Sequence, residues 1–271
     1  MDAHLATNQE HWNELVPIHV KSEFYDLDGF KRGRSTLLPI EREEVGEVAG
    51  KSLLHLQCHF GMDTLSWARL GANVTGVDFS APAIDFARGL SRELNLEARF
   101  ICANLYDLPD ALSGEFEIVF TSYGVLCWLP DLTGWARVIA HFLAPGGTFY
   151  IIDGHPMTNV FSYAADLTDL RVEQAYFSPR HEPERSEGDG SYADPTASVQ
   201  HQVTYEWNHS LGEIITALTD AGLRIEFLHE FPLGFWPRFP SLTERGEDGL
   251  WRFKDPRQSI PLTYSVRARK R

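Results

Sequence analysis

Four stretches of the chain place polar side chains or glycine directly after short runs of β-forming residues. They read HLQCHFG at 55–61, GVDFS at 76–80, ANLYDLP at 103–109 and TSYGVLCWLPD at 121–131. Gly61 lets the backbone approach a ligand closely, and a helix that begins there offers free N–H groups. Asp78 follows that turn by about 20 residues, where a carboxylate can accept hydrogen bonds from both hydroxyls of a ribose. This spacing indicates a site for a ligand that contains a nucleoside.

The elements that carry these stretches alternate between β-rich runs and segments with apolar residues every three or four positions. Over residues 51–154 this pattern is typical of strand-helix-strand units, which form a parallel sheet covered on both faces. We expect strands at 52–57, 73–77, 98–102, 116–122 and 148–153, with helices at 63–70, 82–95 and 132–142. Because ligands bind beyond the carboxyl ends of the strands in such a sheet, the four polar stretches should meet at one edge.

Local residues support these boundaries. Ser80 can cap the helix at 82–95, and the Pro-Gly-Gly sequence at 145–147 cannot continue the helix at 132–142. Residues 171–194 lose periodicity and collect Pro, Gly, Ser and acidic residues, which indicates an inserted loop or hairpin. Beyond it we expect a strand at 199–207, a helix at 211–221 ended by Gly222, and strands at 223–230 and 262–268. The alternating pattern of the last strand suits an antiparallel position.

With these turns in register, the chain resembles the class I S-adenosylmethionine-dependent methyltransferases over residues 51–153 and the last helix and two strands. The resemblance implies an α/β fold with a doubly wound, seven-stranded, mostly parallel sheet in the order 3-2-1-4-5-7-6. The last strand would be antiparallel, and helices would cover both faces. It further implies S-adenosyl-L-methionine as cofactor, S-adenosyl-L-homocysteine as its product, and methylation of O, N or C on a small-molecule metabolite or natural-product intermediate.

The resemblance also assigns parts of the cofactor to residues. It puts the amino-acid part at the first turn, the ribose at Asp78, the adenine at Asn104 and Leu105, and the reacting methyl near Ser122 and Tyr123. The candidate cofactor contacts are Gln57, Cys58, His59, Gly61, Thr64, Asp78, Phe79, Asn104, Leu105, Ser122, Tyr123, Trp12, His19 and Tyr25.

The first turn departs from the family pattern, which is an acidic residue, an apolar one and then Gly-x-Gly-x-Gly. Here His55, Gln57 and His59 replace the acid and the first two glycines, and only Gly61 is kept. Either the chain is an inactive relative that binds the cofactor as a sensor or partner subunit, or Gln57 and His59 contact the cofactor's amino-acid part. We favour the second explanation because Asp78 and the other turns are retained.

Two further segments are expected to enclose the site. Similar enzymes close over the cofactor with an N-terminal helical segment, so residues 1–50 are interpreted as a helical cap, and residues 51–271 as the methyltransferase domain. Tyr25 and His19 suit a binding role because each joins an apolar body to a polar tip, whereas Trp12 could as well pack the cap onto the core. The insertion at about 171–207 would form a lid, and a solvated loop without function is the alternative.

Methyl transfer is an in-line displacement, so alignment of the reacting atoms supplies much of the rate. A general base is needed only where the acceptor loses a proton. His155, directly after the fifth strand, is the first candidate for that base, followed by His209 and Glu206. A structural role is the alternative for each, since most of the 11 histidines must be structural. Neither a C-x-x-C nor an H-E-x-x-H motif is present, so we predict catalysis without a metal.

Composition narrows the remaining possibilities. The 271 residues, 43% of them hydrophobic, suit one elaborated domain, and the net charge of −14 disfavours nucleic-acid and membrane partners. A nicotinamide dehydrogenase would need G-x-G-x-x-G, which is absent. The three cysteines, Cys58, Cys102 and Cys127, lie in apolar runs and are odd in number, which favours a reducing cytoplasm. No signal-peptide pattern begins the sequence, and a homodimer is left open.

Overall fold

The computed structural model describes residues 2–177 and 182–271. Residues 178–181, which belong to the predicted lid, lie outside the described residues. Within the described part, the main sheet consists of β1 (Ser52–Leu56), β2 (Asn73–Asp78), β3 (Ala98–Cys102), β4 (Phe116–Ser122), β5 (Leu143–Gly154), β8 (Leu223–Phe231) and β11 (Thr263–Lys270). The helices are α1 (Ala3–Lys21), α2 (Leu27–Lys31), α3 (Pro39–Val45), α4 (Met62–Arg69), α5 (Ala81–Leu94), α6 (Leu108–Ala111), α7 (Leu132–Phe142) and α8 (Leu211–Asp220). Short 3-10 turns lie at η1 (Leu105–Asp107), η2 (Leu126–Trp128), η3 (Pro156–Val160) and η4 (Pro256–Gln258).

The strand order of the main sheet is β3-β2-β1-β4-β5-β11-β8. Strands β1 to β5 pair in parallel, whereas β11 runs antiparallel to both β5 and β8. Since β8 and β11 are the sixth and seventh strands of this sheet along the chain, the predicted order and the antiparallel last strand are confirmed. The order reverses between β1 and β4, which places the site expected from the sequence beside this point.

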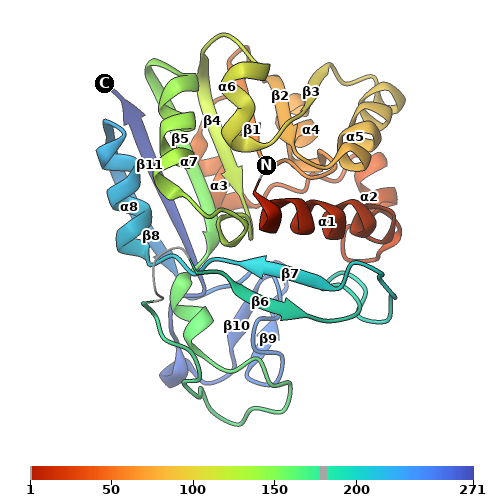
Figure 1. Cartoon of the computed structure of the whole chain (residues 1–271), viewed down its shortest axis with the longest axis vertical. Coiled ribbons are helices and arrows are strands. Elements are labelled where there is room, and N and C mark those ends of the chain that lie inside the picture. The colour runs from red at the N-terminus through yellow and green to blue at the C-terminus, as the bar shows by residue number, and fades with distance from the viewer. Residues whose placement is uncertain (1, 178–181) are drawn as a thin grey trace.

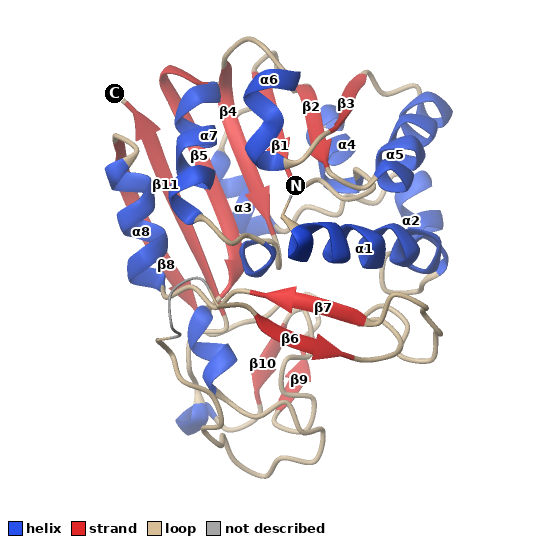
Figure 2. Cartoon of the chain, viewed as in Figure 1, coloured by secondary structure: helices blue, strands red, loops and turns tan. Residues whose placement is uncertain are grey.

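Helices pack on both faces of the sheet (Figure 2) because its strands alternate their apolar side chains. On β4, Val119 points to the side of α7 and α8, while Ile118 and Phe120 point to the side of α3 and α4. Trp135 of α7 and Trp67 of α4 are fully buried on these opposite sides. Each such aromatic side chain contributes roughly 1.5–3 kcal/mol by leaving water. The rigid sheet therefore fixes where its carboxyl ends, and the turns that follow them, lie in space.

Two boundaries differ from the sequence prediction for local reasons. Strand β1 ends at Leu56, because Gln57 adopts a positive φ of 56° that no strand continues. The strand predicted at 148–153 begins earlier, since β5 includes the Pro-Gly-Gly turn. Pairing with β4 shifts there from Phe116–Leu143 to Ile118–Thr148, and this irregularity accommodates the turn.

The insertion forms an antiparallel hairpin of β6 (Glu184–Glu187) and β7 (Val203–Glu206), so the strand predicted at 199–207 is shorter than expected. In Figure 1, α1 runs alongside β7 across the end of the sheet toward which β4 and β5 point. The side chain of Asn8 on α1 donates to the carbonyl of Tyr205 (2.7 Å) and accepts from its N–H (2.8 Å). This pair of hydrogen bonds fixes β7 to the N-terminal helix.

A second small hairpin, β9 (Thr243–Arg245) with β10 (Trp251–Phe253), follows β8 and was not predicted. It carries its own apolar cluster, in which Phe239, Leu242, Phe253 and Leu262 are buried. Both strands have only three residues, which is too short for a periodic pattern to be recognised. The hairpin lies beyond the carboxyl ends of the main strands (Figure 2).

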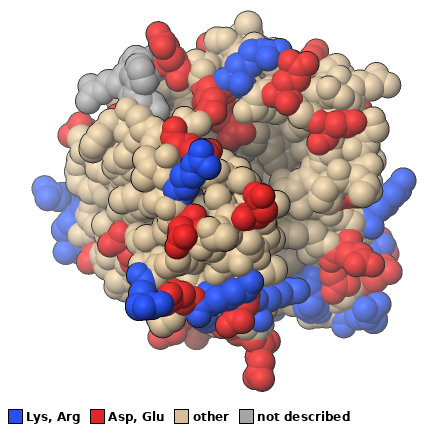
Figure 3. Space-filling model, turned by 90° about the horizontal axis from the view of Figure 1, so that it is seen from below, with Lys and Arg blue, Asp and Glu red and all other residues tan. Residues whose placement is uncertain are grey.

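Among residues 2–177 and 182–271, no helix is long and apolar enough to cross a membrane. The face seen in Figure 3 intersperses acidic and basic side chains and is hollowed near its middle.

Candidate functional site

A cavity of about 800 Å³ lies at the carboxyl ends of the parallel strands. Its walls come from the turns after β1, β2, β3 and β4, from α1, and from the segments that follow β5, β7 and β8. Pockets of 300–1,000 Å³ commonly hold a small molecule or cofactor, so this volume is sufficient for a ligand with a second small molecule beside it.

The turn between β1 and α4 keeps the backbone path of a glycine-rich loop without most of its glycines. Gln57, His59 and Gly61 have φ values of 56°, 50° and 82°. A non-glycine residue in this left-handed region costs roughly 1–2 kcal/mol. At Gly61, an added Cβ would lie 2.8 Å from the ring of Phe100, so a larger residue would clash. The strain at two substituted positions indicates that the side chains of Gln57 and His59 are held for a purpose.

Gln57 presents an unused acceptor to the cavity. Its Nε2 donates to the carbonyl of Val125 (3.1 Å), while its buried Oε1 has no hydrogen-bond partner among the described residues. A buried acceptor left without a donor costs about 1–3 kcal/mol. A ligand N–H bound at this position would remove that penalty.

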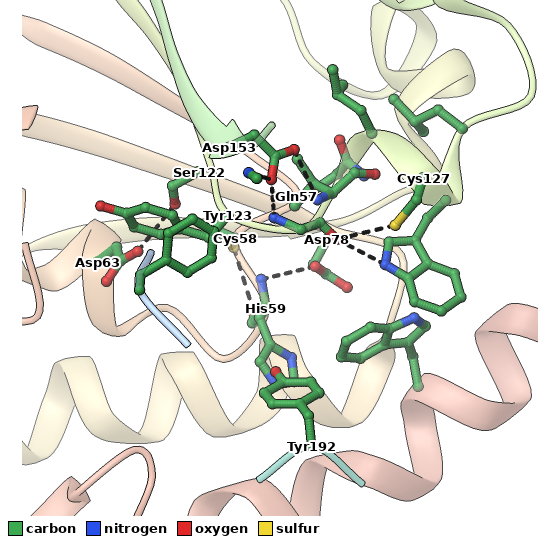
Figure 4. A pocket seen from close by; sticks show the side chains of 18 of the residues that line it. Gln57, Cys58, His59, Asp63, Asp78, Ser122, Tyr123, Cys127, Asp153 and Tyr192 are labelled. Atoms are coloured by element: carbon green, nitrogen blue, oxygen red, sulfur yellow. Dashed lines mark hydrogen bonds between the residues drawn. The ribbon is translucent and has the colours of Figure 1, made fainter. Parts of the chain in front are cut away.

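Asp78, at the end of β2, holds the first turn and faces the same cavity (Figure 4). Its Oδ2 accepts from the N–H of His59 (2.8 Å), and its Oδ1 accepts from the N–H of Ser80 (2.9 Å). Burial raises the pKa of Asp78 to about 6, and the backbone N–H groups of Ser80, His59 and Phe79 offset part of the rise. Because each carboxylate oxygen has a second lone pair, both can still accept a hydroxyl.

The turn after β3 forms an apolar slot next to Asp78. Asn104 begins η1, where its Oδ1 accepts from the N–H of Tyr106 (2.9 Å). This bond leaves the Nδ2 group of Asn104 for a ligand. Leu105 is buried, and it lines the cavity together with Phe79. The slot can hold a flat heteroaromatic ring between apolar side chains, with a polar group at its edge.

A carboxylate that sequence reasoning missed lies where β4 ends. Asp63, in the first turn of α4, lines the cavity and accepts from Ser122 Oγ at 3.1 Å (Figure 4). Burial raises the pKa of Asp63, and hydrogen bonds from Thr36 and Ser122 lower it in part. No ion pair within the described chain includes Asp63. A half-buried carboxylate without a cation can stabilise a positively charged ligand group.

His55, which occupies the position of the family's acidic residue, cannot supply a charge. Burial lowers the pKa of His55 to about 3, so the ring is neutral. Its Nδ1 lies 2.8 Å from Thr64 Oγ1, and its Nε2 lies 3.4 Å from Ser122 Oγ. Thr64 is fully buried and does not line the cavity, so its predicted role as a direct contact is not supported by its position. His55 and Thr64 support Ser122 from behind.

Asp153 at the end of β5 fixes the turn that follows β4. Its carboxylate accepts from the N–H groups of Gly124 and Gly154, the latter at 2.7 Å. Burial raises its pKa, against these N–H groups, which lower it. Asp153 lines the cavity and was not predicted as a site residue, although its place at a strand's carboxyl end was a sufficient signal.

The N-terminal segment contacts the first turn directly. Trp12 and Tyr25 line the cavity, and the Trp12 and His59 rings lie 5.4 Å apart between centroids. His19 does not line the cavity. Instead, its Nδ1 lies 2.9 Å from His59 Nε2 and its Nε2 lies 2.6 Å from Ser191 Oγ. Burial lowers the pKa of His19 to about 4, which leaves it neutral. His19 thus connects α1, the first turn and the insertion.

The three candidate bases differ in whether they line the cavity. Glu206 and His209 line the cavity, whereas His155 does not. Both ring nitrogens of His155 have partners, because Nδ1 accepts from the N–H of Met157 (3.0 Å) and Nε2 lies 2.8 Å from Glu230 Oε1. Of the three residues, His155 is thus the one outside the cavity wall, and its role as base stays a prediction. Its ring closes a turn after β5.

Burial raises the pKa of Glu206, and the neighbouring carboxylate of Glu184 adds to the rise. Burial lowers the pKa of His209, whose Nε2 lies 2.7 Å from the carbonyl of Leu129. Glu206 is therefore the group with free acceptor capacity on this wall. Among residues 2–177 and 182–271, no cluster of three or more His, Cys, Asp or Glu side chains suits a metal ion.

Comparisons with known proteins agree with this geometry. Residues 54–151 match the family described as "Methyltransferase domain". The fold is shared with an S-adenosylmethionine-dependent methyltransferase from Mesorhizobium loti, at a TM-score of 0.60 and 22% identity over 89% of this chain and 100% of that one. It is also shared with geranyl diphosphate C-methyltransferase from Streptomyces coelicolor A3(2), solved with S-adenosyl-L-homocysteine, at a TM-score of 0.52 and 16% identity over 86% and 77% of the two chains.

Residues 54–151 thus form a methyltransferase domain, and the chain has the fold of S-adenosylmethionine-dependent methyltransferases. The resemblance found in the sequence is thereby confirmed. Over 154 residues, the domain is 30% identical to a ubiquinone biosynthesis O-methyltransferase from Xanthomonas euvesicatoria pv. vesicatoria, covering 55% of this chain and 64% of that protein. The match thus spans less than two thirds of the relative's length.

The methyltransferase domain brings most of the predicted cofactor contacts to one cavity. Those that line it are Trp12, Tyr25, Gln57, Cys58, His59, Gly61, Asp78, Phe79, Asn104, Leu105, Ser122 and Tyr123, and those that do not are His19 and Thr64. The residues that sequence reasoning missed are Asp63, Asp153, Tyr192 and Arg238. The last two belong to irregular segments, where no periodic pattern marks a residue as facing inward.

Proposed function

We propose that this protein transfers a methyl group from S-adenosyl-L-methionine to a hydroxyl of a small organic molecule. The observation that carries the proposal is the joint position of Asp78 and the Gln57-to-Gly61 turn. They share one cavity at the reversal point of the sheet, and the turn keeps a left-handed path despite its strain. When bound, the cofactor supplies a methyl group on a positively charged sulfur.

Each part of the cofactor has a complementary group in the cavity. Asp78 would accept both ribose hydroxyls, and Asn104 with Leu105 would hold the edge and face of the adenine. Gln57 Oε1 and Asp63 would accept from the ammonium of the amino-acid part. Gln57 Oε1 is buried without a hydrogen-bond donor, and Asp63 is half-buried without an ion pair in the described chain.

Asp63 replaces the acid that the family pattern has at position 55. The side chain has moved from the end of β1 to the first turn of α4, and the neutral His55 now supports Ser122 from behind. This exchange keeps one negative charge beside the amino-acid part. It supports an intact binding site in spite of the altered first turn.

Glu206 is the proposed general base. Its raised pKa brings its proton affinity closer to that of the acceptor group at neutral pH, which favours proton transfer. It would take the proton of the acceptor hydroxyl while that oxygen bonds to the methyl carbon and the carbon–sulfur electron pair returns to sulfur. The Xanthomonas relative is an O-methyltransferase by name, which supports oxygen as the acceptor atom. His209 is the second choice, because its Nε2 contacts a carbonyl.

The N-terminal segment and the insertion would act as cap and lid. The contacts of His19 with His59 and Ser191, and of Tyr25 with Tyr192, link both segments to the cofactor turn. In this arrangement they exclude water from the reacting atoms, which strengthens the electrostatic contacts there.

Calorimetric titration with S-adenosyl-L-homocysteine tests the proposal. We expect binding by the wild-type protein and a loss of about 1–3 kcal/mol for Asp78→Ala, the range for hydrogen bonds to a charged group. No binding by well-folded wild-type protein at millimolar ligand would remove the proposal.

The altered first turn favours one other function, a sensor or partner subunit that binds the cofactor without transfer. Incubation of the wild-type protein with labelled S-adenosyl-L-methionine and a panel of phenols, amines and keto acids separates the two. Methyl transfer to any panel member rules out the sensor, whereas tight cofactor binding without any transfer supports it.

A further inference from the structure

The wall of the cavity beyond Glu206 contains an arginine that forms no ion pair in the described chain, although the carboxylate of Glu206 is close enough to attract it. Arg238, in the segment between β8 and β9, lines the cavity. Its Nη2 donates to the carbonyl of Thr158 (3.0 Å) and to Asn159 Oδ1 (3.2 Å). The guanidinium carbon lies 3.3 Å from the centroid of the Tyr163 ring. These contacts fix the plane of the guanidinium and leave Nη1 and Nε without acceptors in the described chain.

The two arginines of the cavity wall differ in their partners. Arg34 pairs with Asp26 at 2.9 Å, whereas no ion pair among residues 2–177 and 182–271 includes Arg238. Burial lowers the pKa of Arg238 to about 10, so the side chain is still charged at neutral pH. The carboxylate of Glu206 attracts the guanidinium without forming an ion pair with it, so the N–H donors of Arg238 are still open to a ligand. A half-buried guanidinium with an unpartnered Nε at a cavity wall suits an anionic group of a ligand.

The surroundings of Arg238 are aromatic. Phe235, Trp236, Trp207 and Tyr163 line this part of the cavity. Trp236 packs so closely on β5 that a Cβ at Gly154 would lie 3.0 Å from its ring. Flat apolar walls with one charged donor suit a flat apolar molecule that carries one negative charge.

We propose that Arg238 binds the carboxylate of the acceptor, and that the acceptor is a small aromatic acid. This inference rests on the proposed function and names its substrate class. The guanidinium would donate from Nη1 to the carboxylate, and the ring would lie between the aromatic walls. A single unpaired cation matches a monoanion, and the nearby carboxylate of Glu206 disfavours the second negative charge of a phosphate.

A matched pair of probes tests the charge directly. The protein is first saturated with S-adenosyl-L-homocysteine and then titrated with 4-hydroxybenzoate and, separately, with 4-hydroxybenzamide, which has the same shape and no charge. We expect the acid to bind about tenfold more tightly than the amide, as for a charge-assisted hydrogen bond. Arg238→Gln should remove this ratio while amide binding stays the same, and Arg238→Lys should restore part of it.

Arg34→Gln is the matched control, because it removes the other arginine of the same cavity and should leave the ratio unchanged. Equal affinity of the wild-type protein for acid and amide would overturn the inference, as would no acid binding at concentrations on the order of 10 mM. An unchanged ratio in Arg238→Gln would overturn it too. If Arg238→Gln fails to fold, the two probes on the wild-type protein still decide. If the proposed function itself is wrong, the protein will not bind S-adenosyl-L-homocysteine in the first step, and this outcome is distinct from a failure to bind the acid.

Discussion

The two halves of the cavity are built in different ways. On the cofactor side, Gln57, Asp78, Asn104 and Ser122 each lie at or within two residues of the end of a strand, so the sheet itself aligns them. On the acceptor side, Glu206 and Arg238 belong to insertions that fold back over the sheet edge. The first half is positioned by regular secondary structure and the second by long-range contacts. Binding of the cofactor and choice of the acceptor can therefore change independently.

The halves also differ in charge. The cofactor side holds the carboxylates of Asp63 and Asp78, for which no ion pair is found in the described chain, and the acceptor side holds the cation of Arg238 together with the carboxylate of Glu206. The two carboxylates of the cofactor side would complement a positively charged cofactor, and Arg238 is the group that would bind a negatively charged acceptor. Substitutions in the cofactor half should therefore alter cofactor binding, and substitutions in the acceptor half should alter turnover or acceptor binding.

The largest effect is expected on the acceptor side. Glu206→Gln should lower kcat by about a hundredfold or more on the best acceptor of the panel, the range for loss of a general base. Binding of S-adenosyl-L-homocysteine should stay within twofold of wild type, on the order of the error of additive effects at separate sites. Glu184→Gln on the paired strand is the control and should keep most of the activity. If the Glu206→Gln variant keeps full activity, Glu206 is not the base, and His209 becomes the candidate.

A second prediction isolates the amino-acid part of the cofactor. Asp63→Asn should weaken S-adenosyl-L-homocysteine binding about tenfold, because it removes the charge opposite the ammonium. Binding of 5′-methylthioadenosine, which lacks that part, should not change. Titration of wild-type and variant protein with both ligands gives the change in affinity for each ligand. A parallel loss for the two ligands would mean that Asp63 only supports the fold of the turn.

The raised pKa of Asp78 predicts that cofactor binding depends on pH. The ribose hydroxyls donate to the ionised carboxylate, so a proton on Asp78 competes with the ligand. With a pKa of about 6, only about one molecule in ten is ionised at pH 5. The affinity for S-adenosyl-L-homocysteine should therefore fall by up to about tenfold between pH 7.5 and pH 5. The Asp78→Asn variant should bind S-adenosyl-L-homocysteine weakly, and its affinity should depend little on pH. If the affinity of this variant falls with pH as in the wild type, groups other than Asp78 cause the pH dependence.

The smallest effect concerns the strained turn. His59→Gly relieves a left-handed conformation but removes the ring contacts with His19 and Trp12. The relief of backbone strain stabilises the protein and the loss of ring contacts destabilises it, so the free energy of unfolding should change by less than about 1 kcal/mol. Amide exchange in α1 should nevertheless become faster, because the helix loses its contact with the turn. Asn95→Gly, at another left-handed position, should leave exchange in α1 unchanged.

The approximate bounds of the main strands and helices follow from short-range patterns in the sequence, whereas the strand order and the assignment of cofactor parts to residues came from the resemblance to a family. Asp78 was marked by its place at a strand end, where the backbone dictates its direction, and Asn104 by the position that the family uses for the adenine. Arg238 was missed, since its neighbours Trp236 and Pro237 form no periodic pattern. His155 also follows a strand, but its ring turns away to Glu230, a contact 75 positions distant that no local pattern encodes.

The paired hydrogen bonds between Asn8 and Tyr205 make the first helix a support of the acceptor wall. Glu206 follows directly on the residue that Asn8 holds, although 197 positions separate the two ends of that contact. A substitution near the start of the chain can thus displace the group that would deprotonate the acceptor. When relatives of this protein are compared, positions 8 and 205 should be read together, because a change in one alters the place of the other.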